Sequence, residues 1–175
     1  GCQAAVLGDI HIAHNDEKAT AVSFKLLDEM KPNHTMLHDI VDCESISHHE
    51  EQDPFRVMQK EDNGTGDLKK ELEIMLQWAE ARLKYNLVVV RSNHDDFLDR
   101  WLKTTDWRKD RNKRMFLYGA NILANQAVAQ KKGVISYLLD NAFGDQIKTL
   151  GLDDSYRVLG WELGVHGHVG ANGSR

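Results

Sequence analysis

Cysteine is scarce in this chain, and its scarcity argues against two kinds of small protein. Among 175 residues only Cys2 and Cys43 are cysteines, they lie far apart, and there is no CxxC pair. Two such residues make neither a zinc knuckle nor a disulfide framework. Free thiols in a reducing cytoplasm are the expectation that follows.

Long apolar runs are absent as well. No run reaches the roughly 20 residues that a membrane helix requires, and no basic segment followed by an apolar one opens the chain as a signal peptide would. The net charge is -5, so bulk charge does not favour a protein that coats nucleic acid. That argument weakens if the acidic groups converge on metal ions, because bound cations reverse the local field. We expect an intracellular protein with no membrane segment.

What is present is ordinary globular composition. The chain is 41% hydrophobic and 28% charged, and its length suits a single domain, residues 1–175, with a real core. Residues 170–175 have the composition of a loop, and we expect the chain to be a fragment of a longer protein.

Apolar runs and their periodicity predict strands that alternate with helices. We expect strands at 4–7, 35–37 and 87–90, with weaker candidates at 156–159 and 162–165; helices at 16–30, 67–85, 113–129 and 135–139, and one starting at 97; and a long loop at 42–66. This alternation predicts α/β architecture, in which ligands bind beyond the carboxyl ends of the strands.

Polar clusters follow three of these strands. In chain order they are Asp9 and His11, His38 and Asp39, and Asn93 and His94. Alternation puts residues i and i+2 on one side of a strand, so Asp9 and His11 can face one cation. Each cluster alone is weak evidence. The first suits an exposed loop, and residues 92–96 could simply cap the next helix.

Together, and in this order, the clusters resemble the calcineurin-like metallophosphoesterase family, whose signature runs DxH, GDxxD, GNH[DE], a separate His and GHxH. The first motif is Asp9-Ile10-His11. The second is His38-Asp39-Ile40-Val41-Asp42, with His in place of Gly. The third is Ser92-Asn93-His94-Asp95, with Ser in place of Gly. The resemblance implies an α/β fold, a sandwich of two mixed β-sheets flanked by helices, here incomplete at the C-terminus.

The resemblance also implies two divalent metal ions, manganese first and iron or zinc as alternatives, because the ligands offer nitrogen and oxygen but no thiolate. It assigns His94 to the leaving group as a catalytic residue, with Asp42 and Asp95 as catalytic residues that orient their neighbours. The metal ligands that it implies are Asp9, His11, Asp39, Asn93, His166 and His168.

The histidines near the C-terminus depart from the family pattern. The family has three after GNH[DE], whereas this chain has only His166 and His168. Either these two form the final HxH motif and the lone histidine is lost, or His166 is the lone histidine and the final motif lies beyond Arg175. We favour the second interpretation.

Further segments resemble the metallophosphoesterases of tailed phages, including members linked to degradation of host DNA. A phosphate ester, specifically DNA, is therefore the expected substrate and the host cytoplasm the expected location. His48 and His49 are candidate substrate-binding residues or merely solvated. The alternatives are a phosphomonoesterase acting on nucleotides or phosphoproteins, and a catalytically silent scaffold. The sequence leaves the oligomeric state unknown.

Aromatic and basic residues offer one more candidate surface. Residues 108–114 are basic and lie near Trp101 and Trp107, which would suit a nucleic-acid groove. A solvated helix start is the commoner meaning of such a run. We assign Trp78 and Trp161 to the core.

Overall fold

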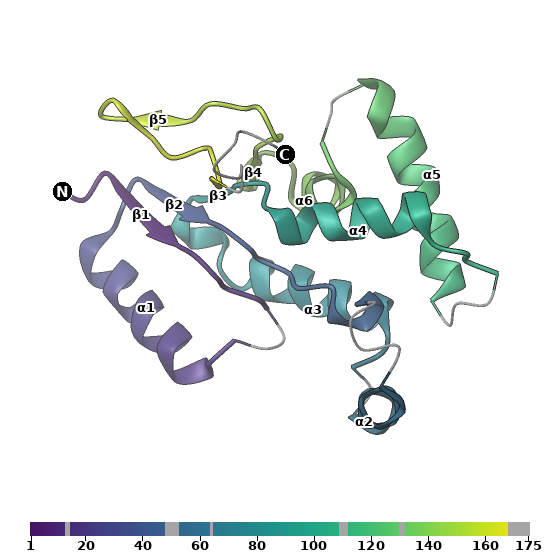
Figure 1. Cartoon of the computed structure of the whole chain (residues 1–175). Coiled ribbons are helices and arrows are strands. Elements are labelled where there is room, and N and C mark those ends of the chain that lie inside the picture. The colour runs from purple at the N-terminus through teal and green to yellow at the C-terminus, as the bar shows by residue number, and fades with distance from the viewer. Residues whose placement is uncertain (13–14, 48–52, 64, 109–111, 130–131, 168–175) are drawn as a thin grey trace.

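The computed structural model describes residues 1–12, 15–47, 53–63, 65–108, 112–129 and 132–167. It has the expected α/β architecture (Figure 1). Its elements are β1 (Ala4–Leu7), α1 (Glu17–Met30), β2 (His34–Leu37), η1 (Glu44–Ile46), α2 (Pro54–Asn63), α3 (Leu68–Glu80), η2 (Leu83–Tyr85), β3 (Leu87–Val89), α4 (Asn93–Thr104), α5 (Lys113–Ala129), α6 (Val134–Phe143), η3 (Gly144–Gln146), β4 (Lys148–Thr149), β5 (Arg157–Val158) and β6 (Trp161–Glu162).

The main sheet has four parallel strands in the order β1-β2-β3-β4. Its register aligns the last residues of neighbouring strands, since Leu7 pairs with Leu37 and Leu37 with Val89. All of its strands therefore end at one edge of the sheet. β5 and β6 form a separate antiparallel hairpin.

The two faces of the sheet are covered differently. Side chains of Leu37, Leu87 and Val89 belong to the large core that the helices complete. In Figure 1, α1 and α3 lie under this face, and the β5–β6 hairpin lies over the other. The second face buries Met36, Val88, Val90 and Leu150, with Tyr156 and Leu163 packed against them.

Several elements were predicted well because their sequence signals are local. The strand at 4–7 is confirmed, and the helix at 113–129 has the expected bounds. Asp16 caps α1 as expected, its carboxylate accepting from the amides of Lys18 and Ala19. Such caps satisfy amides that have no partner in the first turn of a helix.

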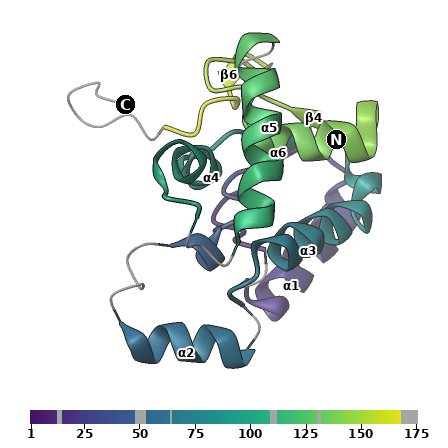
Figure 2. The same cartoon turned by 90° about the vertical axis from the view of Figure 1, so that its right-hand side faces the viewer.

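Other predictions were wrong. The segment at 42–66 is not one loop, since it contains η1 and α2. The helix expected from 97 begins at Asn93, and β4 was not predicted. Trp161 is not in the core, because it is 76% exposed on β6. Neither described sheet is mixed: one is parallel, and the other is a two-stranded antiparallel hairpin. α2 lies at the margin of the molecule in both views (Figures 1 and 2), where its Lys60 contacts Glu44 of η1.

Within the described residues, no helix combines the length and the apolar character needed to cross a membrane.

A buried carboxylate fixes the chain just after the second polar cluster. Glu71 on α3 is 6% exposed and accepts hydrogen bonds from the amides of Glu44 and Ser45 and from the Ser45 hydroxyl, the last at 2.6 Å. Lys60 donates to the Glu44 carbonyl. These contacts tie η1, two residues after Asp42, to α3 through Glu71 and to α2 through Lys60.

Replacing Glu71 by Ala should therefore lower the free energy of unfolding by about 2–3 kcal/mol, because three donors to a charged group lose their acceptor. Urea unfolding measures this. Glu71→Gln should lose less, since the amide still accepts at one oxygen. Glu80→Ala, an exposed position on the same helix, should change stability by no more than about 0.5 kcal/mol. Equal losses for Glu71→Ala and Glu80→Ala would contradict this account.

Candidate metal centre

Backbone hydrogen bonds carry the parallel pairing past the ends of the strands. The amide of His38 donates to the Leu7 carbonyl at 2.9 Å, and the amide of His11 donates to the Asp39 carbonyl at 2.8 Å. On the other side, Val90 donates to the Leu37 carbonyl at 2.9 Å. The polar clusters that follow β1, β2 and β3 are therefore held against one another at the carboxyl edge of the sheet, where ligands bind in α/β proteins.

The backbone is strained at this edge. Asp9, His11 and Asp39 have φ angles of 50°, 42° and 51°, in the left-handed region that non-glycine residues seldom adopt. Such conformations cost of order 1–3 kcal/mol each and cluster at functional sites. The strain turns the chain at the ends of β1 and β2, where the candidate ligands lie.

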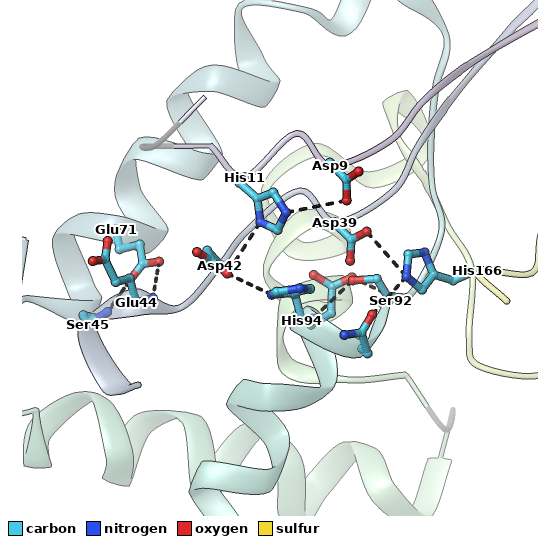
Figure 3. A network of polar contacts seen from close by, with 12 residues as sticks. Asp9, His11, Asp39, Asp42, Glu44, Ser45, Glu71, Ser92, His94 and His166 are labelled. Carbon is cyan, nitrogen blue, oxygen red and sulfur yellow. Dashed lines mark hydrogen bonds and ion pairs between the residues drawn. The ribbon is translucent and has the colours of Figure 1, made fainter. Parts of the chain in front are cut away.

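One group of side chains surrounds His11 (Figure 3). Its Nε2 lies 3.8 Å from Oδ1 of Asp9, and its Nδ1 lies 3.5 Å from Oδ1 of Asp42. The same Asp42 oxygen lies 2.8 Å from Nδ1 of His94. The His11 and His94 rings meet edge to face, with centroids 4.7 Å apart.

A second group surrounds His166, which the chain brings back to the same edge. Its Nε2 lies 2.9 Å from Oδ1 of Asn93 and 3.4 Å from Oδ2 of Asp39. Its Nδ1 lies 3.2 Å from Nδ1 of His38. Burial, and then the neighbouring His166, lower the pKa of His38, which favours the neutral ring. His38 is thus placed to fix the orientation and tautomer of His166.

Asp39 contributes to both groups. It is 4% exposed, its carbonyl holds His11, and its Oδ2 faces His166. Its other oxygen, Oδ1, is buried and has no hydrogen-bond partner. A buried carboxylate needs a compensating cation or donor, and ligand atoms around one ion at about 2.1 Å lie roughly 3 Å apart. The spacing of Asp39, Asn93 and His166 therefore fits a divalent cation.

The side-chain atoms gathered here are nitrogen and oxygen. Cys43 is buried nearby in sequence, but burial raises the pKa of its thiol well above the ordinary value. A neutral thiol is a poor ligand.

The structure brings most of the predicted site residues together. It places Asp42 and His94, which were predicted to be catalytic, beside the predicted ligand His11. Among the described residues, His11, Asp42 and His94 form a group whose ligand atoms all lie within 4.8 Å of one another. A cation could also sit there, although Asp42 and His94 are predicted to be catalytic and not ligands. Three predicted residues lie outside the described ranges, namely His48, His49 and His168.

Asp95 holds the start of α4. Its Oδ2 accepts from the amide of Ser92, and the Ser92 hydroxyl accepts from the amide of Asp95, a reciprocal cap. Asp96 is paired with Arg91 at 2.6 Å. The capping interpretation of residues 92–96 therefore holds for Ser92 and Asp95, while Asp96 pairs with Arg91 and Asn93 and His94 face the site.

Burial raises the pKa of Asp95 to about 7, and the charge of Asp39 adds to the effect. Because folding raises this pKa, the group stabilises the fold most at a pH below its ordinary pKa of 3.8. That contribution is lost as the pH rises through about 7.

Sequence reasoning missed the supporting residues. His38 was recognised as part of the second polar cluster, but no role beside His166 was predicted for it. Glu71 carried no signal, since its partners are 26 and 27 residues away in sequence.

Comparison with known proteins gives one informative match. The chain is 30% identical over 183 aligned residues to Protein A1 of Escherichia phage T5. The match covers 96% of this chain but 33% of Protein A1, so the chain spans about a third of that relative's length. No protein-family model matches the chain, and no solved structure gives a significant match. The expected likeness to a phage protein is thereby confirmed.

The cap of α4 offers a test of how the site is held. Ser92→Ala should lower the free energy of unfolding by about 1 kcal/mol, because the amide of Asp95 loses its acceptor, whereas Ser92→Gly should cost only a few tenths. Thermal or urea unfolding of both variants measures the difference. If Ala proved as stable as Gly, the reciprocal cap would contribute nothing to the fold.

Proposed function

We propose that this chain carries the metal-binding part of a two-metal phosphoesterase of the calcineurin-like metallophosphoesterase type. What carries the proposal is Asp39, a buried carboxylate with one unpartnered oxygen that lies between the His11 group and the His166 group. The order of the three sequence motifs and their meeting at one sheet edge support it further.

The residues present fit two divalent cations. Asp9, His11 and Asp39 would hold one, and Asp39, Asn93 and His166 the other. When bound, two such cations neutralise a phosphate ester and lower the pKa of a water. The N-terminus of α4 lies at the same place, since Asn93 is its first residue, and helix N-termini favour negative charge. Manganese is our first choice of metal, with iron or zinc as alternatives.

His94 is placed to act on the leaving group. Its Nδ1 lies 2.8 Å from Oδ1 of Asp42, so Asp42 can accept a hydrogen bond from Nδ1–H and hold the ring in one orientation. The Nε2 atom is then the one that holds a proton for an oxygen of the substrate. His94 also lines an open pocket where that oxygen could lie. Proton donation of this kind accelerates reactions by typically 10²–10⁴-fold.

For the substrate we propose a phosphodiester, specifically DNA. The support is the likeness to a phage protein and the resemblance to phage-type metallophosphoesterases. A phage-encoded enzyme of this type would act in the host cytoplasm.

Hydrolysis of bis(p-nitrophenyl) phosphate beside p-nitrophenyl phosphate, with added Mn²⁺, tests the proposal. We expect the diester to be preferred and EDTA to abolish turnover. His94→Ala should lower kcat by about 10²–10⁴-fold, the usual contribution of general acid catalysis. Asp39→Asn should remove activity, because it weakens both candidate metal positions.

Two variants serve as matched controls. His34→Ala changes a histidine at the opposite end of β2, where it contacts Tyr156. Asp145→Asn changes an exposed aspartate of η3. Both should keep wild-type turnover. A preference for the monoester would favour a phosphomonoesterase instead. A folded chain that binds Mn²⁺ and turns over neither ester would contradict the enzyme and leave a metal-binding scaffold.

A further inference from the structure

An open pocket begins at the candidate metal centre and extends along α4. Its volume is about 320 Å³, and it is lined by Asp42, Glu44, Ser47, Asn93, His94, Phe97 and Arg100. Three of these residues belong to the metal centre or its His94–Asp42 pair. Phe97 and Arg100 follow His94 at successive steps of three residues, so they continue the same face of α4 outward.

Phe97 and Arg100 offer a flat apolar ring next to a positive charge. Phe97 is partly buried, and the Arg100 guanidinium carbon lies 5.8 Å from the centre of its ring. Among the described residues, no carboxylate pairs with Arg100. By contrast, Arg91 is held by Asp96 and Asp99. Of Arg91, which lies just before α4, and Arg100, which lies within it, Arg100 is therefore the one whose charge is available to a ligand.

A nucleotide is the ligand that matches this pair. Bases stack on aromatic side chains whatever their sequence, and guanidinium groups bind phosphate oxygens in a fork of two hydrogen bonds. The facing wall carries the carboxylates of Asp42 and Glu44, which lie near His94 and Lys60. That wall disfavours a long run of phosphates against it, so the pocket suits one nucleotide and not the backbone of a duplex.

The size of the pocket is consistent with a ligand as small as one nucleotide. Its volume lies at the lower end of the roughly 300–1,000 Å³ that small-molecule sites occupy. A base can enter such a pocket and stack only when it is unpaired.

We propose that this pocket binds one unpaired nucleotide of single-stranded DNA, with Phe97 stacking on the base and Arg100 contacting an adjacent phosphate. The assignment of the neighbouring phosphate as the one that is cleaved rests on the proposed function. The binding itself does not, and it can be measured without turnover.

The test is fluorescence anisotropy in EDTA, where metal-dependent cleavage cannot occur. Two labelled probes of equal length are compared, oligothymidylate and an abasic oligodeoxynucleotide with the same phosphates. The wild-type chain should bind oligothymidylate roughly 10-fold more tightly, since stacking of one base contributes an effect of this order.

Substitutions separate the two contacts. Phe97→Ala should remove the preference for oligothymidylate, and Phe97→Leu should not restore it. Arg100→Ala should weaken both probes equally and reduce the slope of log Kd against log salt by about 1, whereas Arg100→Lys should keep part of that slope. Phe55→Ala on α2, 81% exposed, and Arg157→Ala, exposed on β5, are the matched controls.

Equal binding of the two probes by the wild-type chain would overturn the inference, as would a loss in Phe97→Ala no larger than in Phe55→Ala. Tighter binding of a duplex than of the single strand would also overturn it. These outcomes are independent of ester hydrolysis, because the binding is measured without metal. Base-dependent binding by a chain that lacks turnover would leave the pocket assignment standing and refute the proposed function alone.

Discussion

Parallel pairing of β1, β2 and β3 in register is the constraint on which the site depends. Because Leu7, Leu37 and Val89 are aligned across the sheet, the residues that follow them meet at one edge. Hydrogen bonds from His38 and His11 extend this alignment beyond the strands. Side chains separated by more than 80 residues in sequence are thus brought within reach of a single ligand. The sheet register places them there, and no direct contact between the motifs is needed.

Charge at that edge is the second constraint. Asp39 and Asp95 are both nearly fully buried, and burial raises the pKa of Asp95 to about 7. Each has one carboxylate oxygen without a hydrogen-bond partner. Folding alone does not favour two such groups side by side. Bound cations would offset this cost. The two buried carboxylates are therefore better explained by a binding site than by a contribution to stability.

The sequence predicted the elements whose signals are local. The cap at Asp16 and the apolar runs of β1 and β3 need no tertiary information. It failed where tertiary packing decides. The apolar residues Phe55 and Met58 of α2 are exposed, so α2 lacks the core-facing apolar stripe by which a helix is recognised in a sequence. β4 is only two residues long, too short to give a strand pattern. The polar clusters were recognised by their order along the chain. Nothing local revealed that Glu71 would bind Glu44 and Ser45, or that Phe97 and Arg100 would line a pocket with His94.

The central claim is that two metal ions share Asp39, and anomalous diffraction at the manganese edge from crystals grown with Mn²⁺ tests it most directly. The account predicts two peaks, one beside Asp9 and His11 and one beside Asn93 and His166, each in contact with Asp39. A single peak held by His11, Asp42 and His94, with Asp39 contacting no metal, would contradict it.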